Sequence, residues 1–158
     1  MVKYRHGFIS NSSSSSYIII GNSSYDRLDP LYNRNSNTFD PSLITKSDFI
    51  EFGWGPYTVQ DVQARIVFTM IQVEAMIRNP YGYDEFKGWK TPEGQMLIEV
   101  IKEVSDLQLI WKLPSGAYID HQSRADEDRN IEMFKDKETL KQWIYCNDSK
   151  IVLDNDNH

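Results

Sequence analysis

The feature that most constrains the fold is an apolar stripe in the middle of the chain. Its members follow one another at spacings of four, four, three and four residues: Val62, Ile66, Met70, Val73 and Ile77. This spacing matches the 3.6-residue period of an amphipathic helix and predicts a long α-helix whose stripe faces the core. We expect Thr58 to cap its start, with Asp61 three residues later. Asn79-Pro80 should end it, because proline cannot donate to the helical hydrogen-bond ladder.

Two further helices are predicted from residues that typically start helices. Thr91-Pro92-Glu93 supplies a cap, a proline at the first helical position and an early acidic residue, and an apolar face follows as far as Val104. Asp136 can cap a third helix that reaches about Tyr145. We also expect a short helix within residues 41–52.

Strands are predicted where short apolar runs are bounded by turn residues. Tyr17–Ile20 is rich in β-branched side chains and is followed by glycine, so it should form a buried strand. Leu107–Leu113 and Ala117–Ile119 flank Pro114-Ser115-Gly116, which predicts an antiparallel hairpin. Ile151–Leu153 is expected to be the last strand.

Helices and strands alternate without a regular βαβ rhythm. The pattern therefore favours an α+β fold over a doubly wound α/β fold, with a mixed or antiparallel sheet packed against two or three helices. A length of 158 residues fits a single domain spanning residues 1–158. Asn, Ser, Asp and Pro are frequent at about residues 22–42, which predicts a long surface loop there.

The charge of the chain disfavours some kinds of partner. It has 17 basic and 23 acidic residues and a formal charge of −6. Such a balance gives no general attraction to phosphates, so nucleic acid is not favoured as a partner. The basic residues near the N-terminus, Lys3, Arg5 and His6, are too few to anchor the chain on an anionic membrane.

Three features favour the cytoplasm as the location. The first 21 residues lack the order of basic, apolar and small residues that a signal peptide has. The longest aliphatic run, Ile18–Ile20, is too short to span a bilayer, so we expect no membrane association. Cys146 is the only cysteine, which excludes an internal disulfide and fits a reducing compartment.

A run of five serines lies between apolar flanks: Ser12, Ser13, Ser14, Ser15 and Ser16. The hydroxyls could bind an anion, although the composition favours a flexible linker. The run is not a phosphate-binding P-loop, because the required glycines and the Lys-Ser or Lys-Thr pair are absent. Since both flanks are apolar enough to be buried, we expect residues 10–16 to be ordered and packed near the strand end at Asp120-His121.

Acidic and histidine residues follow two of the predicted strands: Asp120, His121, Asp154, Asp156 and His158. Asp154, Asp156 and His158 alternate, so they would share one side of an extended strand and could ligate Mg²⁺, Mn²⁺ or Zn²⁺. Asp120 and His121 could complete such a site. The simpler alternative is that these are ordinary turn residues and a solvated chain end. No cofactor other than this divalent metal is predicted.

No residue carries a catalytic signature. His121 could act as a base for Ser123 or Cys146, but neither nucleophile lies in a supporting motif. The catalytic residues are therefore unknown, and Cys146 is expected to pack against the sheet. Trp54 and Trp89 each have a glycine beside them in a predicted loop, and we expect them to be exposed anchors for a binding partner.

Two parts of the chain resemble a known group of sequences. Residues 3–17, KYRHGFISNSSSSSY, resemble the opening of a group of uncharacterised bacteriophage and bacterial proteins. Those proteins begin with a basic residue, a Gly-Phe-Val or Gly-Phe-Ile step and a serine run before an aromatic residue. Residues 118–123 and 154–157 are similar to the end of several proteins of the same group. The resemblance implies a phage-associated origin and assigns no activity to any residue.

These observations lead to two hypotheses about function. The first is a small soluble phage-type accessory protein that acts by binding another protein, from host or phage, in the host cytoplasm. Acidic charge combined with aromatic anchors suits a protein interface. The alternative is a metal-dependent enzyme acting on a phosphorylated or nucleotide substrate, with metal ligands at Asp120, His121, Asp154, Asp156 and His158. Whether the chain is an enzyme, and its oligomeric state, remain open.

Overall fold

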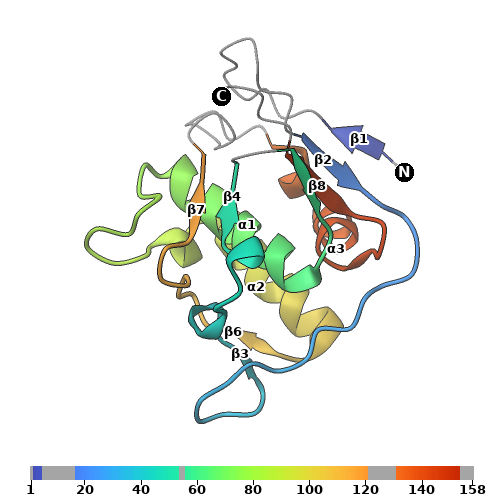
Figure 1. Cartoon of the computed structure of the whole chain (residues 1–158). Helices are drawn as coiled ribbons and strands as arrows, with labels where there is room; N and C mark the ends of the chain where they lie inside the picture. The colour runs from blue at the N-terminus through green and yellow to red at the C-terminus, as the bar shows by residue number, and fades with distance from the viewer. Residues whose placement is uncertain (1, 5–16, 54–55, 121–130, 154–158) are drawn as a thin grey trace.

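The computed structural model describes residues 2–4, 17–53, 56–120 and 131–153 (Figure 1). In these residues the chain forms three α-helices, one four-stranded sheet and two short two-stranded sheets. In the view of Figure 1, helix α1 crosses the middle of the molecule, α3 lies behind β2 and β8, and α2 lies below. The fold is α+β, as the sequence predicts.

Helix α1, Val62–Met76, is enclosed by the rest of the protein. Every one of its residues except Gln63 is buried. The predicted apolar stripe does face the core, since its members within the helix are all buried. The buried side chains are not confined to that stripe, because a helix surrounded on all sides has no solvent face.

The cap of α1 differs from the prediction. Asp61 caps the helix, and its carboxylate accepts hydrogen bonds from the amides of Gln63 and Ala64. The prediction of Thr58 is wrong, because Thr58 is paired with Val152 in the sheet. Strand pairing therefore extends to within two residues of the cap.

The four-stranded sheet is antiparallel throughout. Its strands lie in the order β1, β2, β8 and β5, with the bounds Val2–Tyr4, Tyr17–Ile20, Lys150–Leu153 and Tyr57–Val59. Strands β2 and β8 confirm the two strands predicted at these positions. Alternate residues along them are buried: Ile18, Ile20, Ile151 and Leu153. Strand β5 lies at one edge of the sheet.

The predicted hairpin between residues 107–113 and 117–119 is wrong. The structure has two parallel pairs instead: β6, Gln108–Leu109, with β3, Thr38–Phe39, and β7, Tyr118–Ile119, with β4, Glu51–Phe52. The turn itself does form, because the amide of Ala117 donates to the carbonyl of Pro114 at 3.1 Å and Gly116 has a φ of 78°. A turn depends on residues that are adjacent in the sequence, whereas each of these strands pairs with a segment that is distant in the sequence.

Helices α2, Pro92–Ser105, and α3, Lys137–Tyr145, begin where the sequence predicts. The hydroxyl oxygen of Thr91 accepts a hydrogen bond from the amide three residues later at 2.9 Å. The carboxylate of Asp136 accepts the equivalent bond at 2.7 Å. Each side chain satisfies an amide that has no partner inside its helix.

The segment at about residues 22–42 is mostly irregular but is attached to the core. Leu28 and Phe39 are buried, and the amide of Asp26 donates to the carbonyl of Tyr145 at 2.6 Å. The short helix expected within residues 41–52 is replaced by two 3₁₀ helices, η1, Pro41–Leu43, and η2, Ser47–Phe49. The described residues also contain the 3₁₀ helices η3, Gly88–Lys90, and η4, Glu132–Phe134.

Arg65 is a fully buried cation in the first turn of α1. Its Nη1 donates to the carbonyls of Trp143 at 3.1 Å and Cys146 at 2.6 Å, at the C-terminal end of α3, and its Nη2 pairs with Asp26 at 2.8 Å. Burial lowers the pKa of Arg65, and the Asp26 carboxylate acts in the opposite direction. A cation is favourable at the end of α3 because that end of a helix dipole is negative. Arg65 thus joins α1, α3 and the 22–42 segment.

Candidate functional site

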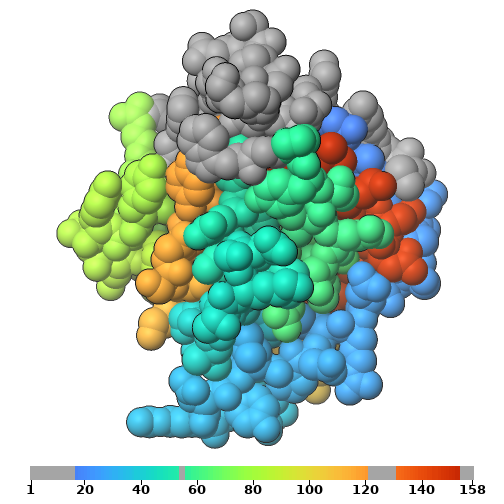
Figure 2. Space-filling view, in the orientation of Figure 1, coloured from blue at the N-terminus to red at the C-terminus, as the bar shows by residue number. Residues whose placement is uncertain are grey.

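The loop between α1 and α2 concentrates exposed aromatic side chains. Of the five large hydrophobic side chains that are exposed in the described residues, three lie here: Tyr81, Tyr83 and Trp89, with exposed fractions of 48%, 84% and 43%. We call residues 77–91 the aromatic loop. It projects from the body of the molecule on the left of Figures 1 and 2. Because aromatic residues are enriched at the centres of protein interfaces, this loop is the candidate functional site.

The aromatic loop leaves α1 through a defined helix end. Arg78 has a left-handed φ of 58°, and its amide donates to the carbonyl of Ala75 at 3.0 Å. The amide of Asn79 donates to the carbonyl of Glu74 at 2.8 Å. These two bonds form a Schellman motif, which closes a helix and fixes the direction of the departing chain. The helix ends where Asn79-Pro80 predicts.

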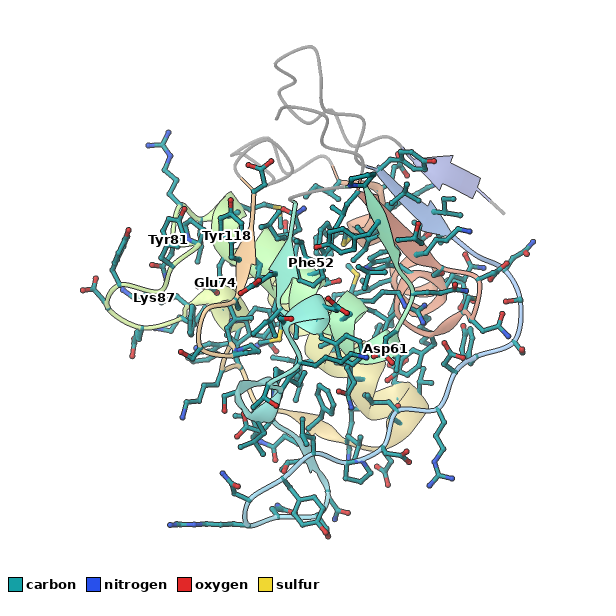
Figure 3. The ribbon with its side chains drawn as sticks, in the orientation of Figure 1. Phe52, Asp61, Glu74, Tyr81, Lys87 and Tyr118 are labelled. Atoms are coloured by element: carbon teal, nitrogen blue, oxygen red, sulfur yellow. The ribbon has the colours of Figure 1, made fainter. Side chains whose placement is uncertain are left out.

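Glu74 is a fully buried carboxylate in the last turn of α1, on the side of the aromatic loop (Figure 3). Its Oε1 accepts hydrogen bonds from the amide of Lys87 and from the side-chain amide of Asn79, both at 3.0 Å. Its Oε2 accepts from the amide of Gly88 and from Nε1 of Trp111, the latter at 3.0 Å. Four donors satisfy a charge that would be costly to bury alone. Both ends of the loop are therefore held by one side chain.

Gly88 shows how closely the loop approaches Glu74. A Cβ atom at this position would lie 2.2 Å from Oε2 of Glu74 and 2.6 Å from the ring of Trp111. A Cβ atom on Gly94 would in turn lie 1.9 Å from the carbonyl oxygen of Gly88. Only glycine fits at both positions, so the chain can reach the carboxylate with its backbone amides.

The tip of the loop is held by Asn79 as well. Its side-chain amide donates to the carbonyl of Glu85 at 2.9 Å, in addition to its bond with Glu74. The carbonyl of Asn79 accepts from the amide of Gly82 at 3.1 Å, where the backbone has a φ of 58°. These bonds close the turn that carries Tyr81 and Tyr83.

The exposed rings are supported by their neighbours. The ring centroids of Tyr81 and Tyr83 are 5.6 Å apart at an interplanar angle of 51°. This separation is typical of favourable aromatic pairs. Nζ of Lys90 lies 5.2 Å from the centroid of the Trp89 ring, within the range of a cation–π interaction.

The exposed aromatic side chains of the loop are suited to recognition. Tyrosine and tryptophan present large apolar faces with a polar tip, and they bind partners at a low cost in side-chain entropy. Since Glu74 and Asn79 fix the backbone beneath them, little conformational freedom remains to be lost on binding. Such an arrangement suits contact with a protein surface.

Among the binding residues predicted from the sequence, Trp89 lies in the aromatic loop and is exposed, as expected. Trp54 lies outside the described residues. So do Ser12, Ser13, Ser14, Ser15 and Ser16, and with them the predicted order of residues 10–16.

Of the predicted metal ligands, only Asp120 lies in the described residues. It is buried at the end of β7, and its amide donates to the carbonyl of Phe52 at 2.8 Å. Gly53 allows this close approach, since a Cβ atom there would lie 2.2 Å from Cβ of Asp120. The remaining predicted ligands lie outside the described residues: His121, Asp154, Asp156 and His158. Within the described ranges, no group of three or more His, Cys, Asp or Glu side chains could hold a metal ion.

Cys146 is buried, as expected, directly after α3. Burial raises the pKa of its thiol, with a further rise from the Asp148 carboxylate. The thiol donates to the carbonyl of Ser23 at 3.3 Å. A protonated, buried thiol is a packing group rather than a nucleophile.

Three residues of the aromatic loop site were not predicted. Tyr81 and Tyr83 stand beside Pro80 and Gly82, and such turn residues place their neighbours at the surface, so the sequence did hold this signal. Glu74 had no comparable signal, because a glutamate outside the apolar stripe of a helix is expected to face solvent.

Comparison of the chain with protein-family models, with curated proteins and with solved structures gives no match to any of them. The class that the fold defines is α+β. None of the helices in the described parts of the chain is long and apolar enough to cross a membrane.

Proposed function

We propose that this chain is a small accessory protein of the phage type that acts by binding another protein, with the aromatic loop as its contact surface. The observation that supports this most directly is the exposure of Tyr81, Tyr83 and Trp89 on a backbone anchored by the buried Glu74. A buried charge that organises an exposed aromatic surface favours a binding role for that surface.

Two properties of the sequence support the same proposal. The formal charge of −6 disfavours nonspecific contact with nucleic acid and leaves proteins as the favoured macromolecular partners. The resemblance of residues 3–17 to the opening of bacteriophage and bacterial proteins supports the phage type. The metal-dependent enzyme stays a prediction from the sequence, because four of its five ligands lie outside the described residues.

The test compares a loop variant with the wild type in quantitative affinity capture from bacterial lysate. The variant Tyr81→Ser/Tyr83→Ser removes two rings that have exposed fractions of 48% and 84%. We expect at least one protein to be captured by the wild type and lost with the variant. Binding measured with that purified protein should weaken by about tenfold or more, as at an interface hot spot.

Tyr32→Ser is the matched control, because Tyr32 is 51% exposed and lies outside the aromatic loop. It should capture the same proteins as the wild type. If the wild type and the loop variant capture identical proteins in equal amounts, the aromatic loop is not the contact surface. If neither retains a specific protein, the proposed function is wrong.

A further inference from the structure

A second surface feature lies beside the edge strand β5. Two neighbouring hollows, with volumes of about 410 and 360 Å³, share Asp48 and Tyr57 in their walls. We call the first the acidic groove; its described walls are Ser47, Asp48, Glu51, Phe52, Tyr57 and Tyr118. Figure 2 shows residues 45–53 and 56–60 beside the segment that carries β7 on this face, and Figure 3 labels Phe52 and Tyr118 there.

The charged side chains among the described walls of the acidic groove are both acidic. Asp48 and Glu51 are exposed, and neither has an ion-pair partner in the described part of the chain. Among the described wall residues there is no Lys, Arg or His. Burial raises the pKa of Tyr57, and the carboxylates of Asp48 and Glu51 add to the rise, so their field acts inside the groove. The groove therefore favours a cation.

The remaining walls of the acidic groove are largely aromatic. Phe52, Tyr57 and Tyr118 contribute rings, and the hydroxyl of Tyr57 is fixed because it donates to the carbonyl of Glu51 at 2.6 Å. A cation beside aromatic rings gains from their quadrupoles as well as from nearby carboxylates. An organic cation with an apolar stem suits this combination better than a hydrated metal ion.

The neighbouring hollow already holds such a cation from the chain itself. Nζ of Lys46 lies 4.6 Å from the centroid of the Phe49 ring, and both residues line the second hollow. Lys46 balances one of the two carboxylates that line this hollow, Asp48 and Asp61, so it attracts a further cation less than the acidic groove does. The acidic groove is therefore the place for a positive group supplied by a ligand.

Strand β5 indicates that this ligand is part of an extended peptide. The strand lies at the end of the sheet order, and its residues Tyr57, Thr58 and Val59 form one wall of the second hollow. An edge strand with an open groove beside it is a common docking place for an extended segment, which pairs with the edge and inserts its side chains into pockets.

We propose that the acidic groove binds an arginine or lysine side chain of an extended segment of a partner protein that lies along β5. The inference rests on the proposed function only in that the partner is a protein. None of the described wall residues of the acidic groove belongs to the aromatic loop, so the variant Tyr81→Ser/Tyr83→Ser keeps all of them.

The test measures binding of the peptide acetyl-Val-Thr-Arg-Thr-Val-amide to the full chain by NMR titration. A matched peptide carries citrulline, the neutral isostere, in place of arginine. We expect shifts of the amide signals of residues 47–52 and 57–61 with the arginine peptide. The citrulline peptide should bind about fivefold more weakly, which is the effect of one ion pair near the surface. Spermidine tests whether the groove binds a free cation, and its binding should be weaker than that of the arginine peptide.

The variants Asp48→Asn and Glu51→Gln should each lower the affinity for the arginine peptide by about threefold. Glu138→Gln removes an exposed carboxylate from α3, outside both the acidic groove and the aromatic loop, and should leave this affinity unchanged. Equal binding of the arginine and citrulline peptides, or no binding at millimolar peptide, would overturn the proposal. Stronger binding of spermidine would show a site for free polyamines instead. The comparison of the arginine and citrulline peptides on the wild-type protein tests the proposal even if one variant does not fold.

Discussion

The two ends of α1 bury opposite charges. Arg65 lies in the first turn and Glu74 in the last, and both side chains are fully buried. Each charge is unfavourable for the dipole of its own helix, which prefers anions at the start and cations at the end. Each is favourable for what it contacts: Arg65 binds the carbonyls that end α3, and Glu74 binds the amides of Lys87 and Gly88.

The difference between the two ends lies in what each charge holds. Arg65 joins two helices and the Asp26 carboxylate, so its contacts belong to the core. Glu74 holds the aromatic loop, whose rings face solvent. One buried charge thus stabilises the fold, whereas the other shapes a surface. A central helix can do both because each of its ends reaches a different neighbour.

The largest effect is expected at the core end of α1. Arg65→Met removes the cation and its hydrogen bonds to the Trp143 and Cys146 carbonyls and to Asp26, and the Cys146 carbonyl keeps the bond from the amide of Ser149. We expect the free energy of unfolding to fall by about 3 kcal/mol, because a buried side chain loses its charge-assisted hydrogen bonds to α3 and Asp26. Urea unfolding followed by tryptophan fluorescence measures it. Arg27→Met is the control, because the Arg27 side chain is 87% exposed, and it should change stability by less than about 0.5 kcal/mol. Equal losses of unfolding free energy in the two variants would show that Arg65 stabilises the fold no more than an exposed arginine does.

A smaller effect is expected at the loop end. Glu74→Gln keeps one acceptor oxygen but directs an NH₂ group at backbone amides, so the free energy of unfolding should fall by about 2 kcal/mol. Hydrogen exchange at the amides of Lys87 and Gly88 should accelerate more than exchange within α3, whose buried amides open only by global unfolding. Glu99→Gln, an exposed carboxylate paired with Lys137 at 3.1 Å, is the control. Unchanged exchange at Lys87 and Gly88 would show that Glu74 does not organise the loop.

The smallest effect on stability is expected for Asp136, an exposed carboxylate at the start of α3, where the helix dipole favours an anion. Hydrogen bonds from the Thr139 backbone and side chain hold the pKa of Asp136, the cap of α3, below its usual 3.8. A lowered pKa in the folded state means that the ionised group adds stability above about pH 5, and that this addition is lost as the pH falls below 3.8. Asp136→Asn keeps a capping oxygen but does not titrate.

The stability difference between the wild type and Asp136→Asn should therefore shrink as the pH falls from 6 to 2. Thermal unfolding at several pH values measures this difference, and other carboxylates cancel because both proteins contain them. A difference that stays constant over this range would show that the cap does not depend on its charge.

The starts and ends of helices are the features that the sequence predicted best. Thr91 and Asp136 cap α2 and α3 as expected, and α1 ends just before Asn79-Pro80. The start of α1 was misplaced, since Asp61 and not Thr58 is the cap. In the candidate site, Trp89 was predicted from its glycine neighbour, whereas Tyr81 and Tyr83 were overlooked despite a comparable turn signal.

Caps, periodicity and apolar runs act within a few residues, so the α+β class, the three α-helices and strands β2 and β8 can be predicted from the sequence. The pairing of β3 with β6 and of β4 with β7, and the hydrogen bond between Trp111 and Glu74, depend instead on how the whole chain packs. These partners are far apart in the chain, and their choice depends on which surfaces remain to be covered once the local elements have formed. The burial of Arg65 and Glu74 depends on the same packing, because a charge is stable in the core only where segments distant in the sequence supply hydrogen-bond donors or acceptors for it.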